Sequence, residues 1–307
     1  MDALRTDNLT KRFGDLTAVN GLNMSVAPGE LFGLIGSDGA GKTTTLRMLA
    51  GIMDPTDGEA WVLDRHTVRE AGAIAEDIGY MSQRFGLYSD LTVQENLNFF
   101  ADLHSLPQRV RDEQVERLLA FSNLAPFNKR LAGNLSGGMK QKLGLACALI
   151  HTPRVLLLDE PTNGVDPVSR RDFWRILYRL LAEGVTILVA TAYLDEAERC
   201  HRVGLIHQGR LLACDTPDNL RKLMTGTILE LRSPDPRRVA HLLREQLPGA
   251  KVGLFGDRLH VVTEDVALVT SRIEALFKEA SLPFPLLRTI EPSLEDVFVS
   301  VMAEQEP

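Results

Sequence analysis

Short apolar runs alternate with amphipathic segments over most of the chain. Compact runs of aliphatic residues predict buried strands, at residues 31–35, 78–81, 155–158, 185–190 and 203–207. Apolar positions spaced three and four residues apart predict helices, at residues 43–51, 92–124, 168–181 and after the turn at 136–138. Because strands that are apolar on both faces alternate with helices, we expect a parallel sheet covered on both sides.

Two other patterns flank this region. Before it, loosely alternating segments bounded by turn residues predict extended chain, at residues 4–13, 18–26 and 59–63. After an expected helix at 217–223, the pattern restarts at Thr225-Gly226 with three strands and three helices, at residues 228–231, 251–255, 259–262, 239–247, 266–278 and 294–302. We therefore expect one domain at residues 1–225 and a small α+β domain at residues 226–307.

Composition and charge narrow the classes of protein. The chain has 307 residues with 44% hydrophobic and 24% charged residues, as in a globular protein. We expect no membrane span and no signal peptide, because no eighteen-residue apolar stretch occurs and the first residues lack a basic or apolar segment. Three dispersed cysteines disfavour disulfides and zinc and suit a reducing cytoplasm. A net charge of −7 disfavours nucleic acid as a partner.

A glycine-rich loop separates the strand at 31–35 from the helix after it. It reads Gly36-Ser37-Asp38-Gly39-Ala40-Gly41-Lys42-Thr43. The glycines let backbone N–H groups converge on phosphate oxygens, and the helix N-terminus adds its positive end. Lys42 would reach the outer phosphates, Thr43 would ligate magnesium and Thr44 would bind the α-phosphate. The alternative is a glycine-rich surface turn, which the flanking strand and helix disfavour.

Two adjacent carboxylates, Asp159 and Glu160, end the apolar strand that starts at Val155. Beside a phosphate loop, Asp159 would hold magnesium directly or through water. Glu160 points in a different direction from its neighbour and would polarise the attacking water. The alternative is an acidic first turn of a helix, because Pro161-Thr162 follows. The upstream phosphate loop favours the catalytic interpretation.

A third motif, Leu135-Ser136-Gly137-Gly138-Met139-Lys140-Gln141, completes a set that resembles the ATP-binding subunits of ABC transporters over about residues 3–220. The resemblance implies an α/β P-loop NTPase fold with a mostly parallel core sheet, an N-terminal antiparallel β subdomain and a helical subdomain at about 84–150. It also implies that this signature, with Leu135, Ser136, Gly137, Gly138 and Gln141, caps an ATP held by a second ATPase domain. An ordinary serine N-cap is the alternative.

Further residues take roles only from this resemblance. Gln83 is similar to the glutamine that contacts magnesium and water, although a solvent-facing amide is the alternative. Asp166, within Gly164-Val165-Asp166, resembles the loop that communicates between the two sites. Phe13 matches the aromatic residue that stacks on adenine, although a core phenylalanine is a rival interpretation.

The chain departs from the family pattern at two positions. Ala192 stands where the family usually has a histidine, and alanine cannot bond the γ-phosphate or orient water. We therefore expect weakened hydrolysis at this site. Asp38 stands where asparagine is more common and places a negative charge near the phosphates.

The segments at 78–83, 90–97 and 135–147 and the ending Glu291 to Phe298 are similar to ATPases of bacterial drug-efflux and antibiotic-resistance systems. The resemblance implies an Mg-ATP-hydrolysing enzyme, peripheral on the cytoplasmic face of the membrane, that powers drug export. Its implied partners are membrane-spanning subunits, a second ATPase domain in a homodimer or heterodimer, and a membrane-fusion protein. The alternatives are a soluble ABC-type ATPase acting on ribosomes and a regulatory subunit that binds ATP without hydrolysing it.

Overall fold

The computed structural model describes residues 2–83, 86–233, 235–247, 250–280, 282 and 286–303, and it divides after Cys214 into two compact units. This division precedes the expected boundary between residues 225 and 226, because helix α8 (Pro217–Arg221) packs against α11 (Leu294–Ala303) of the second unit. The helix expected at 217–223 is thus grouped with the C-terminal unit.

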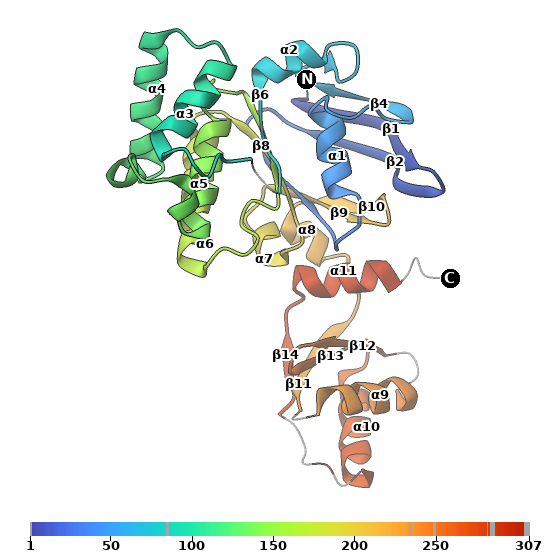
Figure 1. Ribbon diagram of the computed structural model, residues 1–307. Coiled ribbons are helices and arrows are strands. Elements are labelled where there is room, and N and C mark those ends of the chain that lie inside the picture. The colour runs from blue at the N-terminus through green and yellow to red at the C-terminus, as the bar shows by residue number, and fades with distance from the viewer. Residues whose placement is uncertain are drawn as a thin grey trace. The chain divides into compact units, whose positions relative to one another are not determined.

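The first unit opens with an antiparallel sheet in the order β2-β1-β4-β5 (Figure 1). Its strands are β1 (Leu4–Phe13), β2 (Leu16–Val26), β4 (Asp57–Val62) and β5 (Arg65–His66). Leu4 pairs with both Val26 and Val62, and all three side chains are buried on the same side of the sheet. This confirms the expected N-terminal antiparallel β subdomain.

A six-stranded, mostly parallel sheet forms the centre of the first unit, in the order β10-β9-β3-β8-β7-β6. Its strands are β3 (Leu31–Ile35), β6 (Ile78–Met81), β7 (Val155–Asp159), β8 (Thr186–Thr191), β9 (Arg202–His207) and β10 (Arg210–Asp215). Every residue of β3, β7 and β8 is buried, as expected for strands covered on both faces. The carboxyl ends of these parallel strands therefore meet at one edge, at Ile35, Asp159 and Thr191.

Helix α1 (Lys42–Leu49) lies between the two sheets. Its buried Leu46, Met48 and Leu49 share one core with residues of the antiparallel sheet and of the parallel sheet. Because this helix starts directly after the glycine-rich loop, its packing holds the loop in place against β3.

The remaining helices of the first unit cover the central sheet or form a helical subdomain, where α3, α4 and α5 lie together (Figure 1). They are α2 (Ala71–Asp77), α3 (Val93–Leu103), α4 (Gln108–Phe121), α5 (Gly137–Ala148), α6 (Pro167–Ala182) and α7 (Leu194–Ala197), with short 3₁₀ turns at Ala125–Phe127 and Ala132–Asn134. The helical run expected at 92–124 breaks at Ser105, whose φ is 53°, just before Pro107.

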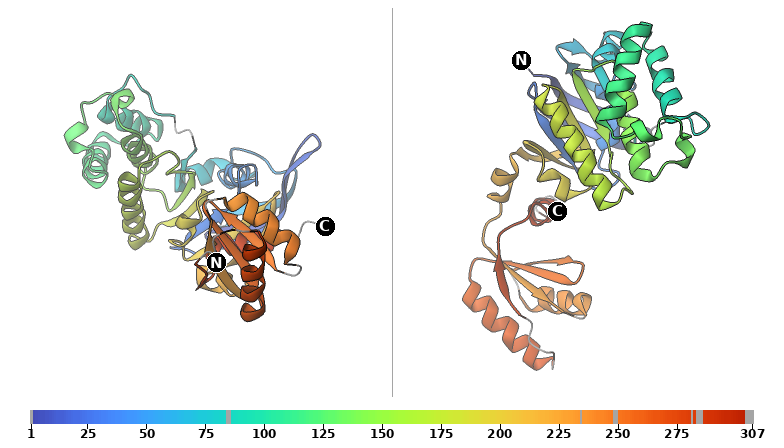
Figure 2. Two further views of the ribbon diagram at one scale, coloured as in Figure 1. Left: turned by 90° about the horizontal axis from the view of Figure 1, so that it is seen from below. Right: turned by 90° about the vertical axis from the view of Figure 1, so that its left-hand side faces the viewer.

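The second unit is a four-stranded antiparallel sheet, in the order β12-β13-β11-β14, with helices on both faces (Figure 2). Leu229, Leu231, Leu259 and Val261 form a core with α9 and α10 on one face, and α11 contacts β12. The remaining bounds are β11 (Thr227–Arg232), α9 (Pro236–Gln246), β12 (Lys251–Phe255), β13 (Arg258–Thr263), α10 (Val266–Glu279) and β14 (Arg288–Ile290). In the described parts of the chain, no helix has the length and apolarity needed to cross a bilayer.

A buried ion pair joins α11 to this sheet. His260 Nδ1 on β13 lies 2.6 Å from Asp296 Oδ1, and Asp296 Oδ2 accepts a hydrogen bond from Ser293 N at 3.0 Å. Burial opposes the charge on His260, but Asp296 and the nearby Glu230 together raise the pKa of this imidazole. Burial likewise opposes the charge on Asp296, but His260 and Ser293 lower the pKa of this carboxyl.

This pair predicts a pH-dependent stability. A histidine whose pKa is raised by folding stabilises the folded state at any pH below its pKa in the unfolded chain. This stabilisation is lost as the pH rises through its pKa in the folded state. An aspartate whose pKa is lowered by folding stabilises the folded state at any pH above its pKa in the unfolded chain. The pair is therefore most effective between about pH 4 and about pH 6.5. Replacing Asp296 by Asn should reduce the free energy of unfolding by about 1 to 2 kcal/mol more at about pH 5.5 than at about pH 9, measured by urea denaturation. Asp218→Asn, on the exposed surface of α8, is the control, and an equal loss at both pH values would contradict this role.

Candidate functional site

The loop between β3 and α1 has a shape that only glycine allows at two positions. A Cβ atom at Gly36 would lie 2.2 Å from the carbonyl oxygen of Ile206, and one at Gly41 would lie 2.4 Å from that of Ala18. Gly41 also has a φ of 105°, which L side chains rarely adopt. The loop therefore curls tightly over the end of β3, in the geometry that a phosphate cradle needs.

Lys42 lies across this loop and is almost fully buried. Its Nζ atom donates to the carbonyl oxygens of Gly36 at 2.9 Å and Ser37 at 3.0 Å, and it lies 3.4 Å from Glu160 Oε1. A buried ammonium beside a curled backbone is suited to receive a multiply charged anion. The structure thus brings together Lys42 and Glu160, which are far apart in the sequence.

Thr43 and Asp159 meet at the edge of the sheet. Thr43 Oγ1 donates to Asp159 Oδ1 at 2.9 Å, and Asp159 is 1% exposed. Its other oxygen, Oδ2, is buried and has no hydrogen-bond partner among the described residues. Burial raises the pKa of Asp159, and the nearby Glu160 adds to this, while the bond from Thr43 opposes it. A hydroxyl beside a buried carboxylate oxygen without a partner fits a hard divalent cation such as Mg²⁺.

Glu160 is held by donors from three separate segments. It directly follows Asp159, the last residue of β7, and has a φ of 48°. Its Oε2 accepts from Gln83 Nε2 and from Asn163 Nδ2, both at 3.1 Å, while Oε1 faces Lys42. Gln83 is exposed at the end of β6 but points into the site, so it is more than a solvent-facing amide. An oriented, poorly hydrated carboxylate of this kind can accept a proton from water.

These groups line one open cavity of about 380 Å³. The phosphate loop contributes Asp38, Gly39, Gly41, Lys42, Thr43 and Thr44, and Gln83 and Glu160 face it. Phe13 lies at its border and is 46% exposed, which excludes a buried core residue. Ala40 is buried and packs under the loop, and exposed Ser37 contributes its carbonyl oxygen to Lys42.

The signature turn does not line this cavity. Ser136 caps α5, with its Oγ accepting from Met139 N at 3.3 Å. Ser136 and Gly137 are exposed, and Leu135 and Gly138 are buried beneath them. Gln141 lies one turn further along α5 and is half-buried.

Asp166 and Ala192 are also outside the cavity lining. Asp166 caps α6, accepting from Ser169 N at 2.9 Å and Val168 N at 3.1 Å, and the bonds from Ser169 lower its pKa. Ala192 is exposed directly after β8. Two further residues belong to this network but were not predicted from the sequence: Asn163, which donates to Glu160, and Tyr193, whose hydroxyl donates to Asn163 Oδ1 at 3.2 Å. Two sequence features could have indicated them: the Asn163-Gly164 turn shortly after the carboxylates, and the tyrosine directly after Ala192.

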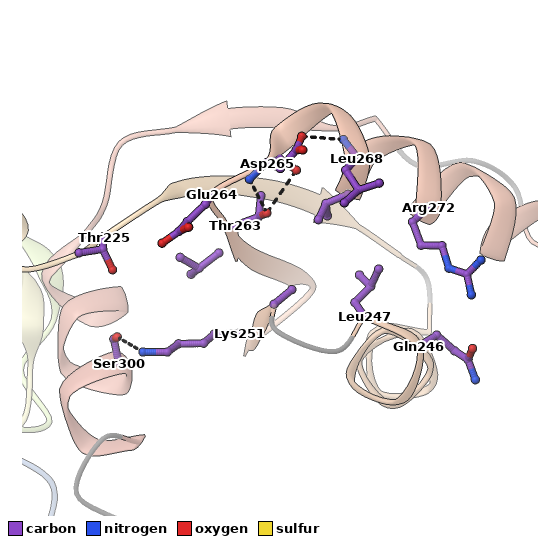
Figure 3. Close-up of a pocket in the computed structure, with 13 residues that line it drawn as sticks. Thr225, Gln246, Leu247, Lys251, Thr263, Glu264, Asp265, Leu268, Arg272 and Ser300 are labelled. Carbon is purple, nitrogen blue, oxygen red and sulfur yellow. Dashed lines mark hydrogen bonds between the residues drawn. The ribbon is translucent and has the colours of Figure 1, made fainter.

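A second cavity, of about 600 Å³, lies in the C-terminal unit (Figure 3). Some of its polar groups bond to neighbouring residues: Lys251 Nζ donates to Ser300 Oγ at 3.2 Å, and Asp265 Oδ1 accepts from Leu268 N at 2.9 Å. Arg272 and Gln246 border the same cavity on the side of α9 and α10, as Figure 3 shows. No reaction chemistry is evident from these groups.

Comparison with known proteins agrees with the geometry. Residues 19–163 match the family described as ABC transporter. The probable multidrug ABC transporter ATP-binding protein YbhF of Escherichia coli K12 is 44% identical over 306 residues, which cover 98% of this chain and 52% of YbhF. The chain thus spans about half of that relative's length. The Nod factor export ATP-binding protein I of Paraburkholderia xenovorans is 38% identical over 307 residues, covering 99% of this chain and 98% of that protein.

Solved structures are also similar to this chain. The ATP-binding subunit of an ABC transporter aligns with a TM-score of 0.66 and 28% identity, over 72% of this chain and 92% of its own. A dimeric ATP-binding cassette in a post-hydrolysis state, bound to ADP and Pi, aligns with a TM-score of 0.64 and 26% identity, over 69% of this chain and 98% of its own. These likenesses confirm the expected fold class.

Proposed function

The chain belongs to the ABC transporter family of ATP-binding proteins, and from this premise we propose that it is the ATP-hydrolysing subunit of a membrane exporter. One observation carries the proposal: Lys42, Thr43, Gln83 and Glu160 line one cavity from three separate segments, and Asp159 accepts a hydrogen bond from Thr43 beside it. Residues 1–225 form the ATP-binding domain in this proposal, and residues 226–307 form an accessory domain.

The cavity suits Mg-ATP. The curled loop of residues 36–41 and the start of α1 supply backbone donors to the phosphates, and Lys42 supplies a charge. Phe13 at the border offers an exposed ring for adenine. Thr43, Asp159 and the amide oxygen of Gln83 would hold Mg²⁺, which neutralises phosphate charge. Oxygen atoms of the phosphates and of water would complete the shell of the ion.

In the hydrolytic step, Glu160 orients a water molecule toward the γ-phosphate. The water oxygen forms a bond to the γ-phosphorus while the bond from this phosphorus to the β,γ-bridging oxygen breaks and ADP leaves. A proton of the water passes to the Glu160 carboxylate or to the phosphate that is formed. Gln83 and Asn163 hold one oxygen of Glu160, which leaves the carboxylate fixed in direction.

The partners follow from exposed surfaces. Ser136 and Gly137 are accessible at the start of α5 and outside their own chain's cavity, which suits capping of a second domain's ATP. A similar cassette is known as a dimer with ADP and Pi, which supports a head-to-tail pair.

Exposed Tyr88 and Phe99, with ring centroids 4.5 Å apart, suit a cytoplasmic helix of a membrane-spanning subunit. The chain would then lie on the cytoplasmic face of the membrane, and a membrane-fusion protein is a further partner.

Export of drugs is supported by the name of one relative, the multidrug ATP-binding protein YbhF, and export of Nod factor by that of another. Co-purification from cells tests the proposal directly. A polytopic membrane protein should co-purify with the chain and stimulate release of phosphate from Mg-ATP. Recovery of ribosomes instead would overturn it.

Ala192 favours one other function, a regulatory subunit that binds ATP without hydrolysis. Replacing Ala192 by His tests this, because an imidazole can bond the γ-phosphate and orient water. If the site is only weakened, steady-state phosphate release should rise by about tenfold or more. Ala182→His, at the exposed end of α6, is the matched control. Absence of phosphate release from both wild type and Ala192→His would favour the regulatory function.

A further inference from the structure

Two hydrogen bonds connect three side chains in a line that ends at Glu160, which lines the cavity. Tyr193 donates its hydroxyl to Asn163 Oδ1 at 3.2 Å, and Asn163 Nδ2 donates to Glu160 Oε2 at 3.1 Å. We propose that Tyr193 is a positioning residue for ATP hydrolysis, acting through Asn163 to hold Glu160 in its water-activating direction. This inference rests on the proposed function.

The amide of Asn163 explains why the phenol matters. An amide presents an acceptor on one side and donors on the other, and exposed Asn163 sits in a turn where its side chain can rotate. The bond from Tyr193 fixes the oxygen toward the phenol and thus the NH₂ group toward Glu160. Without that bond, rotation of the amide would bring its oxygen against the carboxylate, and the two acceptors would repel each other.

Tyr193 is itself held from several sides. Its backbone N donates to the buried Thr191 Oγ1 at 3.1 Å, and the guanidinium of Arg170 lies 4.4 Å from the centre of its ring. Arg170 in turn pairs with Asp195 at 3.1 Å. The phenol therefore occupies a fixed position at the end of β8.

A second, buried set of hydrogen bonds joins the two segments that carry Tyr193 and Asn163. Glu196, which is fully buried, accepts from Thr162 Oγ1 and from Trp174 Nε1. Thr162 directly precedes Asn163, and Glu196 N donates to the carbonyl oxygen of Tyr193 at 3.1 Å. The turn after Glu160 and the segment after β8 are thus tied together beside the bond between Tyr193 and Asn163.

The contacts of Glu160 indicate what the loss of this arrangement would do. Gln83 and Asn163 hold Oε2, whereas Lys42 attracts Oε1 from 3.4 Å. With one donor to Oε2 removed, the carboxylate is freer to turn toward Lys42, and a tightly paired carboxylate is a weaker base. Ala192 has no polar side-chain atom, so the phenol next to it supplies a polar tether from β8 to the catalytic carboxylate.

Tyr193→Phe tests the proposal with a change of one oxygen atom that leaves the ring beside Arg170. In the full chain, kcat for phosphate release from Mg-ATP should fall by about threefold to tenfold, while KM for ATP changes by less than about twofold. Asn163→Ala should have at least the same effect, and adding Tyr193→Phe to it should cause no further loss. The ATP-bound dimer of Tyr193→Phe should also persist longer than that of wild type. Tyr178→Phe, on the exposed side of α6, is the matched control.

The outcomes separate this inference from the proposed function. If wild type releases phosphate and Lys42→Ala does not, but Tyr193→Phe matches wild type, the positioning role is wrong. The same holds if Tyr193→Phe and Asn163→Ala reduce kcat independently, so that their effects multiply. Absence of lysine-dependent phosphate release in wild type overturns the proposed function and the positioning role with it. Thermal unfolding followed by circular dichroism shows whether each variant is folded. If Tyr193→Phe does not fold, kcat and KM of the Asn163→Ala variant alone decide whether the positioning role is right.

Discussion

Replacement of Lys42 by alanine should abolish detectable binding of Mg-ATP. Lys42 is the cation of the phosphate loop, where it is buried beneath the carbonyl oxygens of Gly36 and Ser37. No water-exposed lysine can substitute for it, because the charge must act at close range in a poorly hydrated cradle. We expect affinity to fall by at least about 100-fold, measured by isothermal titration calorimetry with Mg-ATP.

The matched control is Lys129→Ala, because Lys129 is exposed after the helical subdomain's first 3₁₀ turn. Loss of Lys42 also leaves the nearly buried Glu160 without its cation, so the thermal unfolding of the variant must be recorded beside its affinity. A folded Lys42→Ala variant that binds Mg-ATP as tightly as wild type would refute the assignment of this loop as the nucleotide site.

Glu160→Gln should trap an ATP-bound dimer. Glutamine keeps the shape of the side chain and can still accept from Gln83 and Asn163, but it cannot take a proton from water. We expect phosphate release to fall by roughly 10² to 10³, while ATP binding remains. Light scattering coupled to size exclusion, with Mg-ATP in the buffer, should show a dimer that wild type does not accumulate.

Glu113→Gln provides the comparison, since Glu113 lies on the exposed surface of α4, where it pairs only with Arg109 among the contacts described. If Glu160→Gln changed neither turnover nor dimerisation, the role of Glu160 would be wrong even with the nucleotide site intact. A double variant with Lys42→Ala should remain monomeric, because the dimer depends on bound ATP.

Much of the fold of this protein is determined by residues that are close together in the sequence. Strands such as Leu31–Ile35 and Val155–Asp159 are evident because a strand buried on both faces needs an uninterrupted apolar run. The loop Gly36 to Thr43 is evident because backbone curvature toward an anion requires glycine at fixed spacing. In both cases neighbouring residues alone impose the structure, so the sequence by itself determined the core sheet, the phosphate loop and the paired carboxylates.

Other features depend on residues that are distant in sequence. The grouping of α8 with the C-terminal unit reflects its packing against α11, which no local pattern shows. The line from Tyr193 through Asn163 to Glu160 has the same origin, because it joins side chains that follow two different strands. No pattern in the neighbouring sequence by itself marks Tyr193 or Asn163 as part of a functional site. Only the parallel pairing of β7 with β8 places their side chains within hydrogen-bonding distance, and hydrogen bonds act over such short distances alone.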